Sequence, residues 1–213
     1  MTPSILKNVV TMPKQKAKQV RTRISYMSDE QLERFLKAAK EFGQREYAMF
    51  LCAVAHGMRC QEVANLTWED VNFHTNQVRI HRVKGSLESL QDMLKEKGNP
   101  LVDERAALDA WKKVRPDDTG NYVFNSQKSI KLNRVTVHKL FKEIAKKAEL
   151  PATVSHPHVL KHTLAMKLVR SGANAFIIKQ ALGHKSFDSS LAYCKASDID
   201  ASNAIRQAFS SVK

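Results

Sequence analysis

The chain has 213 residues, of which 35 are Lys or Arg and 21 are Asp or Glu, so its net charge at pH 7 is +14. This excess of positive charge predicts a polyanionic partner such as nucleic acid, because basic side chains displace the counterions around phosphate groups. A ribosomal or membrane-surface protein would share the same charge. The hydrophobic fraction of 43% suffices for a domain core and excludes a chain that is disordered throughout.

Cysteine usage and the apolar stretches indicate a compartment. Cys52, Cys60 and Cys194 show neither an even count nor close pairing, which favours free thiols in a reducing environment. The apolar stretches fall short of the roughly 20 residues that span a bilayer, and the start of the chain lacks a signal-peptide core. We therefore expect a cytoplasmic protein without membrane contact.

Residues 1–25 form a basic segment with no acidic residue. Such a segment buries little apolar surface, so it is expected to be a flexible tail until it meets nucleic acid. A solvated leader is the alternative interpretation. Residues 26–213 are then expected to form the folded domain. The tail residues predicted to contact nucleic acid are Lys14, Lys16, Lys18, Arg21 and Arg23.

The first predicted helix begins after Ser28, where Ser-Asp-Glu-Gln forms a capping box. A second helix is predicted around residues 47–54 and ends near Gly57, whose missing Cβ suits a left-handed turn. That turn delivers Arg59 to the start of the next helix. The first three elements are therefore helical.

Residues 76–84 switch to a strand pattern, because Val78 and Ile80 alternate with polar residues, and a turn is indicated at Gly85. The pattern predicts a small antiparallel sheet with Lys84 at its rim. The fold class is thus α+β and mostly α-helical.

Further elements follow a stretch of weak signals. The periodicity predicts helices over residues 103–114 and 134–148, and a short strand at 122–124. The remainder is expected to be helical, with turns at Gly172, at Gly183 and around Asp188.

Chemistry-bearing residues gather near the end of the chain. His158, Lys161 and His162 have helical spacing and are expected to share a face. Together with Arg59 they suit a site that grips a phosphodiester, whose own charge must be neutralised before a nucleophile attacks. The histidine pair at i and i+4, with His156 nearby, would also suit zinc, but no glutamate lies between the pair to act as a base.

Several separated motifs occur in a fixed order along the chain. They are residues 57–71 (GMRCQEVANLTWEDV), His158-x-x-Lys161-His162-Thr163, Leu182-Gly183-His184 and Tyr193. The first resembles the first motif of the tyrosine recombinases, also called the phage-integrase family, and the others match the second half of the family pattern in order and spacing. The similarity covers roughly residues 28–205. It implies the recombinase catalytic fold and a site-specific recombinase or integrase, associated with mobile elements, that cleaves and rejoins DNA.

The resemblance assigns a role to each matching residue. It implies that Tyr193 attacks the phosphorus and forms a 3′-phosphotyrosyl link, and that His158 is the candidate base. The other assigned roles are Arg59 and Lys161 as phosphate ligands, His184 as a donor to the scissile phosphate, Lys84 as general acid, and Glu62 and His162 as supporting residues. Neither a metal nor a cofactor is expected, because side chains hold the phosphate charge.

The chain departs from the family pattern at Lys161, where an arginine is usual. Lysine supplies a point charge in place of a two-pronged clamp, and losing one such donor can cost about 10²–10³ in rate. Two interpretations stay open, a natural variant that the site accommodates and a catalytically attenuated relative that only binds DNA.

Length is the second departure, because most members carry a DNA-clamping domain of about a hundred residues ahead of the catalytic domain. Either the chain resembles short members such as the fimbrial-switch invertases, or it is an excised catalytic domain. DNA affinity is then expected to rest on the catalytic face and the tail and to fall steeply with salt.

The family also implies a tetramer on double-stranded DNA, with accessory DNA-bending proteins as possible partners. The segment from Ile199 to Phe209 has the pattern of a short amphipathic helix, which is expected either to pack on its own domain or to dock on a neighbouring protomer. A type IB topoisomerase shares the tyrosine chemistry, but Leu-Gly-His and the short span to Tyr193 favour a recombinase.

Overall fold

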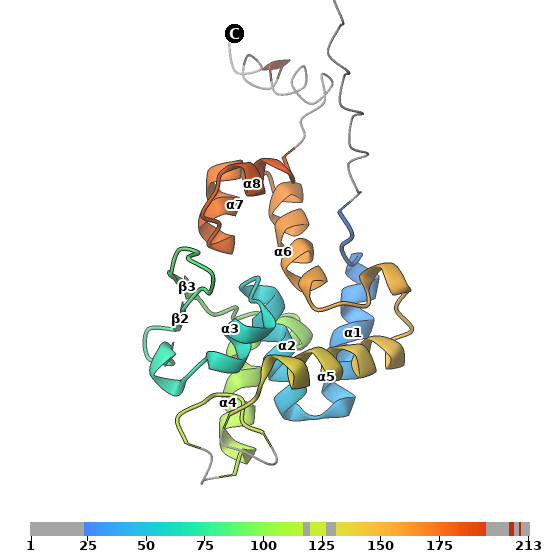
Figure 1. Cartoon of the computed structure of the whole chain (residues 1–213), viewed down its shortest axis with the longest axis vertical. Helices are drawn as coiled ribbons and strands as arrows, with labels where there is room; N and C mark the ends of the chain where they lie inside the picture. Colours follow the sequence, from blue (N-terminus) through green and yellow to red (C-terminus); the bar gives the residue numbers. More distant parts are fainter. Residues whose placement is uncertain (1–23, 117–119, 127–130, 195–204, 207–208, 210–213) are drawn as a thin grey trace, which may run out of the picture.

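The computed structural model describes residues 24–116, 120–126, 131–194, 205–206 and 209. Within them the chain is mostly helical with a small antiparallel sheet, which confirms the predicted fold class (Figure 1). The helices are α1 Asp29–Phe42, α2 Gln44–Ala55, α3 Cys60–Asn65, α4 Glu104–Val114, α5 Arg134–Lys147, α6 His158–Arg170, α7 Ala175–Leu182 and α8 Asp188–Leu191. The strands are β1 Val71–Asn72, β2 Gln77–Ile80 and β3 Ser89–Asp92, and short 3₁₀ turns cover Trp68–Asp70, Pro100–Val102 and Ala152–Val154.

The entry into α1 and the passage from α2 to α3 form as the sequence predicts. The Ser28 hydroxyl accepts from the Gln31 amide at 3.2 Å, and the Gln31 side chain accepts from the Ser28 amide at 2.9 Å. Gly57 has a φ of +57° and turns the chain after α2. A Cβ on Gly57 would lie 2.6 Å from a methyl carbon of Leu182, so this turn packs against the end of α7.

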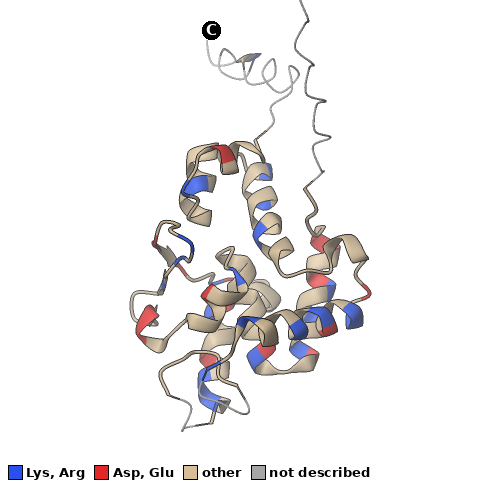
Figure 2. Cartoon of the chain, viewed as in Figure 1, with Lys and Arg blue, Asp and Glu red and all other residues tan. Residues whose placement is uncertain are grey.

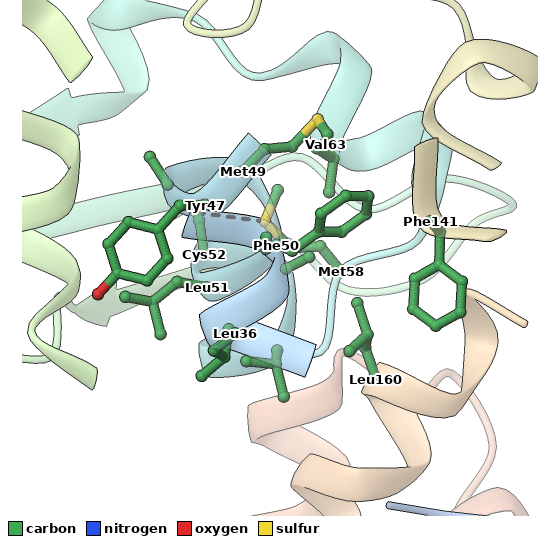
Figure 3. Close-up of a cluster of buried hydrophobic side chains, with 14 of the residues drawn as sticks. Leu36, Tyr47, Met49, Phe50, Leu51, Cys52, Met58, Val63, Phe141 and Leu160 are labelled. Atoms are coloured by element: carbon green, nitrogen blue, oxygen red, sulfur yellow. Dashed lines mark hydrogen bonds between the residues drawn. The ribbon is translucent and has the colours of Figure 1, made fainter. Parts of the chain in front are cut away.

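The main core lies among α1, α2, α4, α5 and the first turns of α6. Phe35, Phe50 and Phe141 meet there with ring centroids 4.8 to 5.7 Å apart, in edge-on and tilted contacts that favour tight aromatic packing. Leu160 of α6 is 2% exposed and belongs to the same cluster (Figure 3). The beginning of α6 is thereby fixed to the body of the molecule.

The sheet has the strand order β1-β2-β3, and both pairs are antiparallel. Val78 and Ile80 are fully buried, as their alternation predicts, while Arg79 between them is exposed. Strand β3 was not predicted from the sequence. Its only buried position is Ser89, while Leu90 is 57% exposed, so β3 carries no apolar alternation from which it could be read.

The second half of α6, together with α7 and α8, forms a smaller region beside the main body (Figure 1). Its buried hydrophobic cluster, of Ala165, Ile178, Leu182 and Tyr193, is separate from the main core. Gly183 ends α7 in the left-handed conformation, with a φ of +62°. No helix among the described residues is long and apolar enough to cross a membrane.

Three predictions about the elements need correction or fall outside the described residues. The predicted strand at 122–124 is wrong, because only Tyr122 makes a bridge, to Thr67, while the following residues are buried in irregular backbone. The predicted turn around Asp188 precedes that residue, which begins α8. Most of the predicted helix at 199–209, and the basic segment up to residue 23, lie outside the described residues.

Candidate active site

Arg59 stands at the N-cap of α3, held by Glu62 one turn further along. Its guanidinium donates to a Glu62 carboxylate oxygen at 2.7 Å, and its backbone amide donates to the other oxygen at 2.9 Å. A quarter of the Arg59 side chain remains exposed, whereas that of Glu62 is fully buried. Glu62 therefore orients Arg59 and leaves part of the guanidinium open to solvent.

Arg82 completes the environment of Glu62 and was not identified from the sequence. Its guanidinium donates to Glu62 at 3.2 Å, and its side chain is completely buried. The Val83 amide also donates to Glu62 at 3.2 Å. Burial alone would raise the pKa of Glu62, but the hydrogen bonds from Arg59 and the charge of Arg82 lower it. Glu62 is thus a buried carboxylate that connects two arginines.

The turn between β2 and β3 carries Lys84, which is exposed and has a φ of +60°. Ser86 in this turn accepts from Arg59 at 3.3 Å, and the Leu87 amide donates to the Gly183 carbonyl at 3.2 Å. A Cβ on Gly183 would lie 2.7 Å from the Leu87 carbonyl oxygen, so only glycine permits this approach. The predicted rim position of Lys84 is confirmed, and its turn lies between Arg59 and the Leu-Gly-His segment.

Lys161 is buried, with 2% exposure, and its ammonium group donates to the Leu182 carbonyl at 2.6 Å. Burial, together with the positive charges of Arg59 and Arg82, lowers the pKa of Lys161 to about 7. An ammonium has three donors, so two remain for a ligand. Lys161 therefore lies in the same cationic cluster as Arg59.

Three successive backbone carbonyls at the end of α7 accept hydrogen bonds from other parts of the molecule. Carbonyls in the last turn of a helix lack partners within the helix. Here the Ala181 carbonyl accepts from Arg82 at 2.9 Å, the Leu182 carbonyl from Lys161, and the Gly183 carbonyl from Leu87. The segment that presents His184 is therefore attached to both the sheet and α6.

His184 and Tyr193 lie against each other in the smaller region. Their rings are nearly parallel, with centroids 6.3 Å apart, and His184 Nδ1 is 2.9 Å from the Ser190 hydroxyl. Burial lowers the pKa of His184 to about 4 and raises the pKa of Tyr193 to about 12. In the absence of DNA, Tyr193 is thus a protonated phenol beside a neutral imidazole.

The hydroxyl of Tyr193 pairs with His162, not with His158. His162 Nδ1 lies 2.7 Å from the Tyr193 hydroxyl, whereas the His158 ring meets the His162 ring edge-on at 4.7 Å. Partial burial lowers the pKa of His162 to about 4, with a contribution from neighbouring His158. The resemblance made His162 a supporting residue. The sequence could not distinguish it from His158, because both follow from the same helical spacing.

The cluster can neutralise a phosphate and place a phenol beside it. Figure 2 shows Lys and Arg along α6 without an acidic residue, while the helices of the body carry both signs. Of the α6 cations, Lys167 and Arg170 pair with Asp29, so the positive charge of the cluster comes from Lys161 and Arg59. This combination suits attack on a phosphodiester, since both charge neutralisation and a nucleophile are present.

Among the described residues, the group of possible metal ligands is Cys52, His56 and Glu104, all buried in the main body. His56 Nε2 already pairs with Glu104 at 2.8 Å and its Nδ1 with Gln91 at 2.8 Å. Burial would lower the pKa of His56, but the Glu104 carboxylate outweighs it and raises the pKa. The group is accounted for as an ion pair that joins α2, β3 and α4.

Comparisons with known proteins agree with these motifs. A model of the phage integrase family matches residues 25–199. The type 1 fimbriae regulatory protein FimE of Escherichia coli strain K12 is 28% identical over 169 residues, which are 77% of this chain and 78% of FimE. The crystal structure of XerA recombinase matches with a TM-score of 0.70 and 26% identity, over 88% of this chain and 64% of XerA.

A further structure shares the fold. The XerH site-specific recombinase, crystallised with its difH substrate as a pre-cleavage complex, matches with a TM-score of 0.68 at 20% identity, over 84% of this chain and 53% of XerH. This chain thus spans about half to two thirds of the two recombinase structures and most of FimE.

Proposed function

We propose that the chain, which belongs to the phage integrase family and is a tyrosine-type site-specific DNA recombinase, cleaves DNA with Tyr193 as its nucleophile. One observation carries the assignment. The Tyr193 hydroxyl lies 2.7 Å from the imidazole of His162, and His162 belongs to α6, the helix that also bears buried Lys161. The attack forms a 3′-phosphotyrosyl bond and releases a 5′-hydroxyl. The free hydroxyl of a partner strand then reverses the step and rejoins the DNA.

Arg59 and Lys161 are assigned to the non-bridging oxygens of the scissile phosphate. Arg59 is oriented by Glu62 and keeps part of its guanidinium exposed, which suits a planar fork that grips two oxygens. Lys161 adds a point charge from α6. His184, held by Ser190, supplies a further hydrogen bond, and the exposed Lys84 is the general acid for the leaving 5′-oxygen.

A covalent-trapping assay tests the assignment. The chain and a Tyr193→Phe variant are incubated with nicked DNA whose cleaved fragment diffuses away, and adducts that survive denaturation are counted. We expect an adduct only from the parent chain. An adduct of equal yield with Tyr193→Phe, on DNA that both proteins bind equally well, would show that another residue attacks.

The attenuated, DNA-binding interpretation has no support in the site. Lys161 lies 2.6 Å from the Leu182 carbonyl and retains donors for a phosphate, so charge neutralisation is preserved. The trapping assay with Lys161→Arg separates the two interpretations. An adduct from Lys161→Arg but not from the parent chain would favour attenuation.

DNA is the partner of the chain, and a homotetramer on DNA is the assembly we propose. Supporting it, Ile205 and Phe209 are 61% and 69% exposed, and Phe176 and Ile177 on α7 are 71% and 51% exposed. Exposed apolar side chains of this size are typical of protein contacts. Accessory DNA-bending proteins are further candidate partners. Sedimentation with and without a cleavage-site duplex tests the tetramer.

The basic tail is proposed to contact DNA beside the catalytic domain, residues 26–213. The residues concerned are Lys14, Lys16, Lys18, Arg21 and Arg23. Each phosphate contact adds to the salt dependence of affinity, so deleting residues 1–23 should reduce the slope of log affinity against log salt. An unchanged slope would contradict the proposed contact. Since the substrate is DNA, we infer a cytoplasmic location.

A further inference from the structure

The immediate partner of the Tyr193 hydroxyl is His162. The distance from His162 Nδ1 to the phenolic oxygen is 2.7 Å, a normal length for a hydrogen bond between neutral groups. The two residues come from the first half of α6 and from the turn after α8, which lie 31 residues apart in the sequence. The contact is therefore set by tertiary packing.

The other basic groups near Tyr193 are engaged elsewhere. His184 Nδ1 pairs with the Ser190 hydroxyl, and the Lys161 ammonium donates to the Leu182 carbonyl. His158 contacts the His162 ring at 4.7 Å and is itself exposed. Among the hydrogen bonds of the described residues, that of His162 is the one made to the nucleophile by a side chain.

The protonation states fix the direction of this hydrogen bond. Burial keeps the phenol protonated, because it raises the pKa of Tyr193 to about 12. The pKa of His162 is lowered to about 4, so its imidazole is neutral and has one acceptor nitrogen. The phenolic proton therefore points at Nδ1, and the other ring nitrogen, Nε2, carries the imidazole hydrogen.

We propose that His162, rather than His158, accepts the proton of Tyr193 during DNA cleavage. The Tyr193 oxygen forms a bond to phosphorus, its proton moves to His162 Nδ1, and the bond from phosphorus to the 5′-oxygen breaks. The leaving oxygen takes a proton from Lys84. In rejoining, the 5′-hydroxyl returns its proton to Lys84 and His162 returns the other to Tyr193, so the enzyme ends as it began.

DNA itself makes His162 a stronger base than it is in the free protein. Burial and the nearby groups His158, His156 and Lys161 all disfavour the protonated imidazole. A bound phosphate brings negative charge to the same cluster and offsets the cationic neighbours. Proton acceptance by His162 is thus coupled to correct placement of the substrate.

The inference rests on Tyr193 being the nucleophile, and the test separates the two. His162→Asn places an amide oxygen near the position of Nδ1, so it can hold the phenol but cannot take its proton. Single-turnover cleavage of nicked DNA is measured for His162→Asn, His158→Asn, Tyr193→Phe and, as a matched exposed control, His138→Asn. Melting temperature and DNA affinity are recorded for each variant.

We expect His162→Asn to cleave about 10²–10⁴-fold more slowly than the parent, the usual range for loss of a general base, and His138→Asn to be unaffected. The rate of His162→Asn should rise with pH as hydroxide replaces the base. Added imidazole should accelerate His162→Ala but not His162→Asn. The inference would be overturned if His162→Asn cleaved at the rate of the parent. It would also be overturned if His158→Asn, and not His162→Asn, showed the slow cleavage that rises with pH.

A substrate with sulfur in place of the bridging 5′-oxygen distinguishes the residue that takes the Tyr193 proton from the residue that protonates the leaving group. A thiolate leaves without a proton, so this substrate should restore cleavage by Lys84→Ala and leave His162→Asn slow. Rescue of His162→Asn would overturn the inference, because it would place His162 on the leaving group. Equal adduct formation by Tyr193→Phe would instead refute the proposed function.

Discussion

The body of the molecule and the region formed by α6, α7 and α8 differ in how deeply they are packed. In the body, Phe35, Phe50 and Phe141 are at most 1% exposed and lie within one large cluster. In the smaller region the buried hydrophobic cluster, among the residues that the structure describes, comprises Ala165, Ile178, Leu182 and Tyr193. The proposed phosphate ligand Arg59 thus stands on the well-packed part, and the proposed nucleophile Tyr193 on the less deeply packed one.

This difference suggests a division of labour. A deep core holds Arg59 and Glu62 at fixed positions, which pre-organised charge stabilisation requires. A region with little apolar burial opens locally at a lower free energy than the whole domain. We therefore expect Tyr193 to be able to move with little disturbance of Arg59. The contacts at Ala181, Leu182 and Gly183 join the two regions.

Truncating one core side chain in each region should expose the difference most strongly. We expect Phe141→Ala to lower the free energy of unfolding by about 3–5 kcal/mol, because it empties a large site in the main cluster. Ile178→Ala in the smaller cluster should lower it less, while amide hydrogens of α7 and α8 exchange faster. Chemical denaturation and hydrogen exchange measure the two effects. Equal losses and uniform exchange would mean that the regions unfold as one unit.

Replacing Arg82 should weaken the contacts that join the two regions, because Arg82 binds both Glu62 and the Ala181 carbonyl. Arg82→Met leaves the buried Glu62 carboxylate short of a charged donor and the Ala181 carbonyl without its guanidinium. Removing one partner of a buried pair typically costs about 3 kcal/mol or more. We expect cleavage to fall further than DNA affinity, because the orientation of Arg59 and of the Leu-Gly-His segment is affected. Single-turnover rates and binding isotherms separate the two.

Arg79→Met is the matched control for Arg82→Met. Arg79 lies on β2, three residues before Arg82, but its side chain is 55% exposed and its ion pair with Glu88 spans 3.9 Å. Exposed pairs of this kind contribute little to stability. A loss of cleavage as large in Arg79→Met as in Arg82→Met would refute the positioning role of Arg82.

The sequence predicted the body better than the junction. The helices of the body follow from capping residues such as Ser28 and from apolar periodicity, which are local signals. Strand β3 has no such signal, because it pairs through its backbone and exposes Leu90. The predicted strand at 122–124 failed for the opposite reason, since Val123 and Phe124 are buried in irregular backbone.

The candidate site divides in the same way. Arg59, Lys84, Lys161, His184 and Tyr193 were identified because they belong to motifs with fixed spacing. Arg82 and Ser190 were not identified. Arg82 contacts the Ala181 carbonyl, which is distant in sequence, and Ser190 contacts His184 only because a turn brings its hydroxyl to the imidazole. Arg82 is two residues beyond Ile80, so alternation puts it on the inward face, but no local signal shows that a charged side chain is fully buried there.

Acid should weaken the smaller region before the body. The pKa values of His162 and His184 are lowered to about 4, so the unfolded chain binds more protons than the folded one between roughly pH 6.5 and pH 4. Stability is therefore lost as pH falls through that window. His56 in the body has a raised pKa and opposes the trend. Hydrogen exchange at pH 7 and pH 5 should show protection lost first in α7 and α8.

The remaining expected effect concerns Lys161, which joins α6 to the end of α7 through the Leu182 carbonyl. Its pKa of about 7 in the DNA-free protein means that binding a phosphate above neutral pH requires proton uptake. Affinity for a cleavage-site duplex should then fall as pH rises from 7 to 9, by up to about tenfold per pH unit. Lys161→Arg should flatten this dependence, because a guanidinium stays charged throughout the range. Calorimetry in buffers of different ionisation enthalpy measures the proton uptake directly, and an equal uptake in Lys161→Arg would assign the proton to another group.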